Sequence, residues 1–308
     1  MTTTHLTRIG IIGGSGVGAA LRNGMHPDAL ELHDVETPFG SPSGPVLTGT
    51  YHGTPVAILE RHGLGHVLNP ARVPYRANVF ALKAVGCSHV IASGATGSLS
   101  DQFVPGHLVV CDQVIDRTEG RERTFYDKAA VHVEFADPFC PVMRRWLLDA
   151  AGRAGIEGVH ERGTYMCMSG PSFSTRAESK LYRLWGADVV GMTALPEARL
   201  AREAEMAYAL VALPTDYDCW RPRPAGADHA SLLHEIRENL EHAVEASLVL
   251  LKAALQNTAV LQGEPSPAHD ALALAIWSDK SAIDPMEVDR LRVLWGRHWS
   301  PDMVGRIV

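Results

Sequence analysis

An unbroken apolar run at residues 207–213 constrains the fold of this chain more than any other part of its sequence. The run is short and ends at Pro214, which is typical of a β-strand buried on both faces. Two carboxylates, Asp216 and Asp218, follow it directly. Because ligands of open α/β sheets bind at the ends of strands, these acids are candidates for contact with a nitrogen-rich ligand. A simple turn is the alternative interpretation, since aspartate is common in turns.

Similar apolar runs alternate with segments of helical periodicity along the rest of the chain, and this alternation predicts an α/β fold with helices on both faces of a sheet. Residues 46–59 predict a hairpin that turns at His52-Gly53, and the polar stretch 121–137 predicts a long loop. Helices are predicted at 76–85, 143–154, 177–185, 196–204 and 231–255, and strands at 8–13, 90–99, 108–111, 114–116, 163–168 and 189–193.

Composition restricts the class of function. The chain has 308 residues, of which 46% are hydrophobic and 20% charged, as in folded globular proteins. A formal net charge of −7 argues against a nucleic-acid-binding surface. Five cysteines without a CxxC pair are typical of a reducing compartment. No stretch reaches membrane-spanning length and the start lacks a signal-type core, so we expect a cytoplasmic protein that binds no membrane.

Two further strand ends carry residues suited to an anion. The first strand runs into Gly13-Gly14-Ser15-Gly16, where successive backbone N–H groups could bind phosphate, although a tight turn is equally compatible. Arg61 and His62 follow a later strand, and an arginine fork suits phosphate oxygens. Plain surface charge is the alternative for this pair. A nicotinamide-binding fold is disfavoured because Ala19 occupies the third glycine place of the fingerprint.

The domain organisation is predicted from a change in composition near residue 263. A stretch rich in Gly, Pro and Ser at 263–267 indicates a linker. We therefore predict one main domain at 1–262 and a linker with a helical extension of unknown role at 263–308. The extension is rich in tryptophan and predicts one or two helices that dock on the main body, but it carries no recognisable chemistry.

Taken together, several strand-end motifs resemble the 5'-methylthioadenosine phosphorylases, a branch of the trimeric purine nucleoside phosphorylases. They are residues 11–16, 36–43, 61–63, 173–179, 191–197 and 215–220. The resemblance covers about 9–255. It implies a single α/β domain with a central mixed, partly barrel-like β-sheet flanked by helices, assembled as a homotrimer. It also implies phosphorolysis of a 5'-substituted adenosine with inorganic phosphate as co-substrate, without metal or organic cofactor.

The resemblance also assigns roles to single residues of this sequence. Asp216 would protonate N7 of the purine and Asp218 would accept from the 6-amino group. The phosphate-binding residues would be Ser15, Arg61, His62, Gly94 and Thr193. The nucleoside-binding residues would be His66, Ala95, Phe173, Met192, His229 and Leu233, with His132 contributed by a neighbouring subunit.

The chain departs from the family at a few of these positions and leaves alternative substrates open. Gly94 replaces a phosphate-binding threonine, Gly191 replaces the usual asparagine, and Ser169 replaces a glutamate. His229 stands where methylthioadenosine phosphorylases tend to have a small apolar residue, which suggests a small polar or halogen 5' group as the alternative. Preference for a 6-oxopurine is disfavoured, because a carboxylate such as Asp218 pairs with an amino group. A non-catalytic nucleoside-binding relative is a further alternative.

Overall fold

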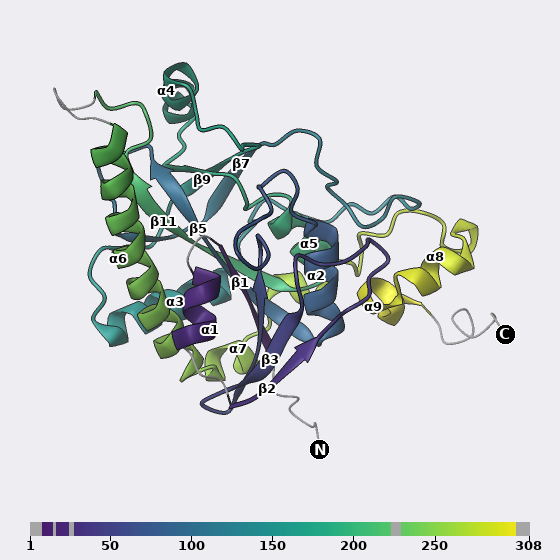
Figure 1. Ribbon diagram of the computed structural model, residues 1–308. Helices are drawn as coiled ribbons and strands as arrows, with labels where there is room; N and C mark the ends of the chain where they lie inside the picture. The colour runs from purple at the N-terminus through teal and green to yellow at the C-terminus, as the bar shows by residue number, and fades with distance from the viewer. Residues whose placement is uncertain (1–7, 15–16, 25–27, 223–228, 300–308) are drawn as a thin grey trace.

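The computed structural model describes residues 8–14, 17–24, 28–222 and 229–299 (Figure 1). Within these ranges the chain forms one eleven-stranded mixed sheet, flanked by helices on both faces. This confirms the predicted fold class. The strands are β1 (Arg8–Gly13), β2 (Asp28–His33), β3 (Val46–Tyr51), β4 (Thr54–Glu60), β5 (Cys87–Ser98), β6 (Leu108–Val110), β7 (Gln113–Arg117), β8 (Val159–His160), β9 (Thr164–Met168), β10 (Val189–Gly191) and β11 (Ala207–Asp216).

The five helices predicted at defined ranges correspond to α2, α3, α4, α5 and α6, whereas α1 and α7 were not predicted. The α-helices are α1 (Val17–Gly24), α2 (Tyr75–Ala84), α3 (Pro141–Ala154), α4 (Arg176–Leu184), α5 (Glu197–Glu203), α6 (His229–Leu255), α7 (Ala259–Gly263), α8 (Pro285–Arg290) and α9 (Arg292–Trp295). Short 3₁₀ turns occur at η1 (Pro267–Asp270), η2 (Lys280–Ala282) and η3 (Gly296–His298). Local chemistry accounts for several ends: Thr175 and Glu178 form a capping box at the start of α4, and Gly155 ends α3 with a φ of 64°.

Strand β5 is the branch point of the sheet. It pairs with β1 and β11 in parallel and with β10 in antiparallel fashion near its end. On one side of β5 the sheet continues from β10 through β9 to β7. On the other side it continues from β1 through β4 and β3 to the edge strand β2. The predicted hairpin is confirmed as β3–β4, and its turn has positive φ at both His52 and Gly53, as type I′ turns require. Strand β2 was not predicted.

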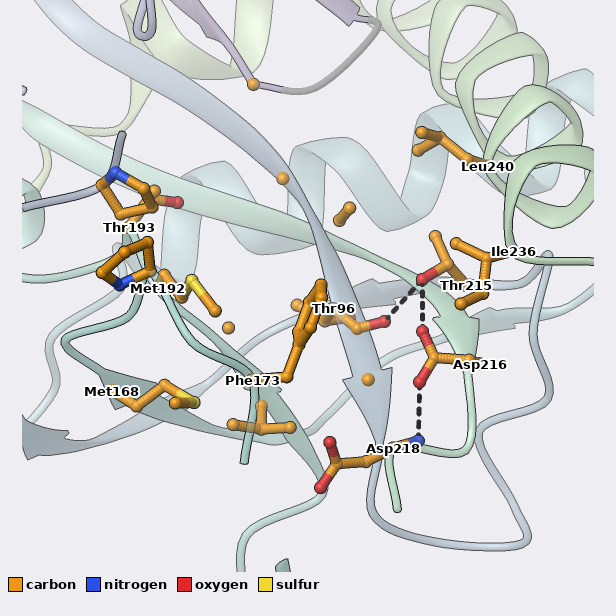
Figure 2. Close-up of a pocket in the computed structure, with 18 of the residues that line it drawn as sticks. Thr96, Met168, Phe173, Met192, Thr193, Thr215, Asp216, Asp218, Ile236 and Leu240 are labelled. Atoms are coloured by element: carbon orange, nitrogen blue, oxygen red, sulfur yellow. Dashed lines mark hydrogen bonds between the residues drawn. The ribbon is translucent and has the colours of Figure 1, made fainter. Parts of the chain in front are cut away.

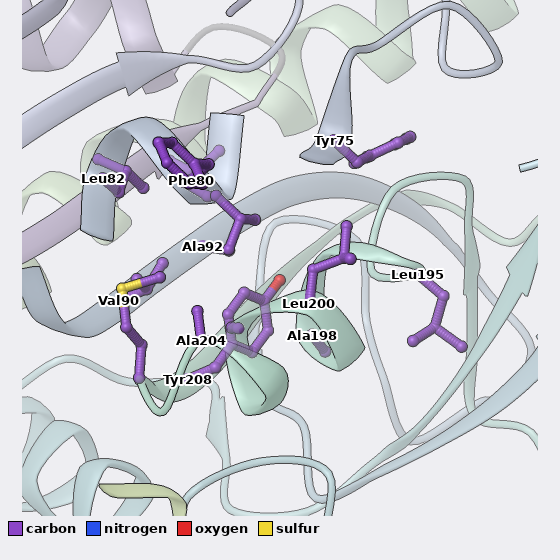
Figure 3. Packing of buried hydrophobic residues seen from close by; sticks show 14 of the residues in the cluster. Tyr75, Phe80, Leu82, Val90, Ala92, Leu195, Ala198, Leu200, Ala204 and Tyr208 are labelled. Atoms are coloured by element: carbon purple, nitrogen blue, oxygen red, sulfur yellow. The ribbon is translucent and has the colours of Figure 1, made fainter. Parts of the chain in front are cut away.

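Two hydrophobic layers enclose the central strands. Every residue of β11 from Ala207 to Thr215 is buried, which confirms the strand that is covered on both faces. Tyr208 and Leu210 pack in the layer formed with α2 and α5, whereas Ala209 and Val211 pack in the layer formed with α3 and α6. The alternation follows from the two-residue period of a strand. Figure 3 shows the first of these layers.

The C-terminal segment packs into the same core as the sheet. Leu291, Leu294 and Trp295 are buried in the cluster that contains α2, and the Trp295 ring stacks on Tyr126 at a centroid distance of 4.7 Å. The buried Glu205 carboxylate anchors the segment, because Arg297, His298 and the backbone N–H of Leu272 all lie within hydrogen-bond distance of it. In Figure 1 this part, drawn in yellow, lies beside α2.

One result bears on membranes. No single helix in the described ranges is long and apolar enough to cross a bilayer. Residues Leu233–Leu255 and Ala259–Asp270 meet the length and composition criteria only as a pair, and the pair is bent by 53°. The inner part of α6 also lies in the protein core, where Leu250, Leu251 and Leu255 are buried.

We expect Trp295→Ala to destabilise the protein by about 3–5 kcal/mol, because it removes a fully buried indole and leaves a cavity between the C-terminal segment and the main body. Urea unfolding monitored by circular dichroism would measure the loss. Met286→Ala is the control, since Met286 is 72% exposed in the same segment. Equal stabilities of the two variants would contradict an integral role of this segment in the core.

Candidate active site

A cavity of about 310 Å³ opens where β5, β10 and β11 end. Figure 2 shows Asp216 and Asp218 near one end of this cavity and Thr193 near the other. Loops that follow the parallel strands β1, β4, β5 and β11 meet there because parallel strands end at one edge of the sheet, and β10 joins them from its antiparallel pairing with β5. The lining includes Gly14, Arg61, His62, His66, Gly94, Ala95, Thr96, Met168, Phe173, Met192, Thr193, Thr215, Asp216, Asp218, Ile236 and Leu240.

The acidic end is built by an irregularity in the pairing of β11 with β5. The register shifts between Pro214 and Asp216, so the chain turns and brings Asp218 into the left-handed region with a φ of 48°. Asp216 Oδ1 accepts from the backbone N–H of Asp218 at 2.7 Å, and its Oδ2 lies 2.7 Å from the Thr215 hydroxyl. A Cβ at Gly97 would lie 3.0 Å from the Cβ of Asp218, so a larger residue there would press on Asp218 and require it to shift by a few tenths of an ångström.

Both carboxyl groups have raised pKa values. Burial is the main cause for Asp216 and for Asp218, because removal from water penalises the ionised form. Hydrogen bonds from neighbouring groups oppose the shift without cancelling it. A carboxyl group with a raised pKa is suited to act as a proton donor near neutral pH.

The opposite end presents groups suited to an anion. Arg61 is completely buried, and its guanidinium borders the cavity beside Gly14 and Gly94. The Thr193 hydroxyl lies at the same place, since a Cβ added at Gly94 would come within 3.4 Å of its oxygen. A Cβ at position 94 would thus meet Thr193 at an ordinary van der Waals distance, and nothing in the structure explains the glycine at this departure from the family.

His62 is neutral at this end of the cavity. Its Nδ1 lies 2.7 Å from the carbonyl oxygen of Leu68, and because a carbonyl only accepts, Nδ1 is the protonated nitrogen. Burial and the adjacent Arg61 charge lower the pKa of His62 to about 4. The His66 ring stacks on it with centroids 4.2 Å apart, and the pKa of His66 is lowered for the same reasons. His62 thus presents Nε2 as an acceptor, suited to a protonated oxygen of an anion.

Apolar side chains form the remaining wall. Phe173 is 84% exposed and therefore available to cover a ligand, while Met168 and Met192 lie on the same side of the cavity in Figure 2. Ile236 and Leu240, one turn apart on α6, close the opposite side. An aromatic ring and flexible thioethers suit a flat heterocycle.

The structure brings most of the predicted residues together around this cavity, but not all of them. Leu233 is 48% exposed and does not line it; Ile236 and Leu240 of the same helix do. His132 is exposed and lies outside the cavity of its own chain. Ser15 and the side chain of His229 lie outside the described part of the structure.

Several lining residues were missed by sequence reasoning. Ile236 and Leu240 lie in the helix predicted at 231–255, where apolar residues at helical spacing are typical of core packing, and Met168 ends a strand without a polar signal. The departure at Gly191 also has a structural cause, because a Cβ there would lie 2.0 Å from the Tyr165 hydroxyl. The Tyr165 hydroxyl also lies 3.4 Å from the backbone nitrogen of Thr193. The Tyr165 side chain therefore occupies the space that an asparagine side chain at position 191 would need.

Comparison with known proteins identifies the class. Residues 8–256 match the profile of the phosphorylase superfamily. The chain is 43% identical to the S-methyl-5'-thioadenosine phosphorylase of Synechocystis sp. over 300 residues, covering 95% of this chain and 88% of the relative. It is 46% identical to that of Cereibacter sphaeroides over 241 residues, with 77% and 80% covered. The chain therefore belongs to the phosphorylase superfamily, in its S-methyl-5'-thioadenosine phosphorylase branch.

Solved structures agree with this assignment. A methylthioadenosine phosphorylase from an Antarctic soil metagenomic library superimposes with a TM-score of 0.84 at 40% identity, covering 94% of this chain and 99% of that one. The Schistosoma mansoni methylthioadenosine phosphorylase in complex with adenine gives a TM-score of 0.77 at 34% identity, with 88% and 99% covered. The resemblance stated from the sequence is thereby confirmed.

We expect Asp216→Asn to stabilise the protein at pH 7. A carboxyl group with a raised folded pKa contributes stability in its protonated form, and that contribution is lost as pH rises through the folded pKa. Asparagine removes the buried charge, and the Thr215 hydroxyl can then accept from its amide. The gain, about 1 kcal/mol, should appear in thermal unfolding at pH 7 and shrink toward pH 4. A gain independent of pH, or a loss, would contradict the assignment of a raised pKa.

Proposed function

We propose that this chain catalyses the phosphorolysis of 5'-methylthioadenosine to adenine and 5-methylthioribose 1-phosphate. One observation carries the proposal: a single cavity has paired carboxyl groups at one end and an arginine, a threonine and a neutral histidine at the other. A purine and a phosphate placed at these ends would have the sugar between them. The identity to curated S-methyl-5'-thioadenosine phosphorylases supports the same reaction.

The proposed chemistry is a displacement at the anomeric carbon. A phosphate oxygen bonds to that carbon as the carbon–N9 bond breaks, and the bonding pair leaves with the purine. Asp216 gives its proton to N7, which neutralises the leaving base. The negative phosphate stabilises the positive charge that develops on the sugar. The balance requires no electron donor or acceptor, because inorganic phosphate is the only co-substrate.

The proposed contacts follow from donor and acceptor types. Asp218 accepts from the exocyclic amino group, which favours adenine over a 6-oxopurine. Arg61, Thr193 and the backbone near Gly94 donate to phosphate, and His62 accepts its proton. Ser15, His66, Ala95, Phe173, Met192 and His229 retain the contacts that the resemblance implies, whereas Ile236 and Leu240 take the place of Leu233. All of these residues lie in the proposed catalytic domain, 1–262.

A homotrimer is part of the proposal. His132 of one chain would reach the 5' end of the nucleoside bound to a neighbouring chain. Support comes from its exposed position outside its own cavity and from its location in the long loop 121–137. Its ring packs against Trp277 with centroids 4.7 Å apart, which holds the side chain on the C-terminal segment.

The reaction is tested by measuring adenine release with and without phosphate. We expect release to depend on phosphate, and Asp216→Asn to lower turnover by about a hundredfold or more through loss of a positioned acid. Arg61→Ala should chiefly raise the KM for phosphate, because a charge-assisted hydrogen bond is lost. Glu157→Ala, at an exposed residue that does not line the cavity, is the control. Equal rates with and without phosphate would refute the proposal.

Two observations favour adenosine as a second substrate. His229 is a polar residue at a position where the family tends to have a small apolar one, and a similar protein of S. mansoni, 33% identical to this chain, is an adenosine/methylthioadenosine phosphorylase. We expect turnover of adenosine, and of 5'-halo-5'-deoxyadenosines, beside that of methylthioadenosine. His229→Val should shift the ratio of kcat/KM values toward methylthioadenosine, because a hydrogen-bonding ring is replaced by an apolar group. A strong preference for the methylthio group that is the same in both proteins would contradict this role for His229.

A further inference from the structure

Arg61 is held by a polar cluster that lies behind the cavity wall. Its Nε donates to Glu197 Oε2 at 2.8 Å and its Nη2 to Glu197 Oε1 at 2.9 Å, so the pair is bidentate. Nη1 donates to the carbonyl oxygen of Ser93 at 2.7 Å. Arg61 and Glu197 are both completely buried. Such a fork fixes the plane of the guanidinium as well as its position.

The remaining N–H groups have a definite direction. Of the five N–H groups of the guanidinium, three are used by Glu197 and Ser93, which leaves one on each terminal nitrogen. Nη1 faces the cavity floor, because a Cβ added at Gly14 would lie 2.8 Å from it and one added at Gly94 would lie 3.8 Å away. The orientation of this group therefore sets the direction of the hydrogen bond that Arg61 can offer to an anion there.

Tyr208 extends the cluster by one more hydrogen bond. Its hydroxyl donates to Glu197 Oε1 at 2.9 Å, the same oxygen that accepts from Arg61 Nη2. Tyr208 is 2% exposed and lies at the start of β11, and Figure 3 shows its hydroxyl directed away from the strand. Neither Tyr208 nor Glu197 lines the cavity. Both can therefore affect a ligand only through Arg61.

We propose that Glu197 and Tyr208 are positioning residues for the phosphate half of the site. Together they hold the Arg61 guanidinium so that one Nη1–H points at the anion. The carboxylate also cancels the arginine charge, so phosphate is selected by the direction of hydrogen bonds rather than by a net positive field. This inference rests on the proposed function, in which Arg61 contacts phosphate.

Steady-state kinetics of Tyr208→Phe test the inference with little change in shape. Loss of one hydrogen bond to Glu197 should raise the KM for phosphate about 3- to 10-fold. The KM for the nucleoside and the Kd for adenine should stay within about twofold, since the acidic end is untouched. Tyr126→Phe is the matched control: it removes a buried tyrosine hydroxyl that donates to the carbonyl of Glu203, away from Arg61. It should leave the phosphate KM unchanged.

Glu197→Asp separates position from charge. It keeps the carboxylate but shortens the side chain by one methylene, so the guanidinium should retract and the phosphate KM should rise about tenfold or more. Charge balance alone predicts no change. A phosphate KM that stays within twofold in Tyr208→Phe would overturn the inference, as would equal changes in the phosphate KM and the adenine Kd.

The result for Arg61→Ala distinguishes failure of the positioning role from failure of the proposed phosphorylase function. If that variant raises the phosphate KM and Tyr208→Phe does not, the positioning role is refuted and the phosphorylase proposal stands. If Arg61→Ala itself leaves the phosphate KM unchanged, the phosphate assignment fails, and the positioning role fails with it. A selective rise in both variants supports both statements.

Discussion

The parallel pairing of β5 with β11 is the interaction on which the rest of the structure depends. The two strands stay in register from His89–Ala207 to Thr96–Pro214, and then slip by one residue. Along the regular part both strands are buried between helical layers, which strongly specifies the register. The slip occurs after a proline, which cannot donate to the ladder. One paired element thus carries the anion end at Gly94 and the acidic end at Asp216.

This arrangement gives up some stability for chemistry. Burial raises the pKa of Asp216 and lowers that of His62, so in both groups it favours the uncharged form. Neither shift helps the chain to fold. Both pKa shifts are tolerated because the packing of the surrounding strands and loops holds these groups in place, as is common at functional sites.

Much of the fold could be predicted from the sequence, because its signals are local. The hairpin at 46–59 and the buried strand at 207–213 follow from alternation and from continuous apolar character, and the structure contains both. The Arg61–Glu197 pair could not be found in this way, since 136 residues separate the partners and only the sheet topology brings them together. Leu233 shows where the resemblance to the family fails to predict the site. The resemblance placed Leu233 in the cavity, but the rotation of α6 about its axis turns Ile236 toward the cavity instead.

The two ends of the cavity meet opposite electrostatic demands by different means. At the acidic end, burial raises the pKa values of Asp216 and Asp218 and so favours the uncharged form that can donate a proton. At the other end, the Arg61 charge is balanced by Glu197 behind the wall, which leaves directed donors without a large field. Because donors and acceptors are separated along one axis, a ligand with an amino-purine at one end and an anion at the other fits in one orientation only. The polarity of the cavity is therefore a consequence of where the strands end and of what is buried behind them.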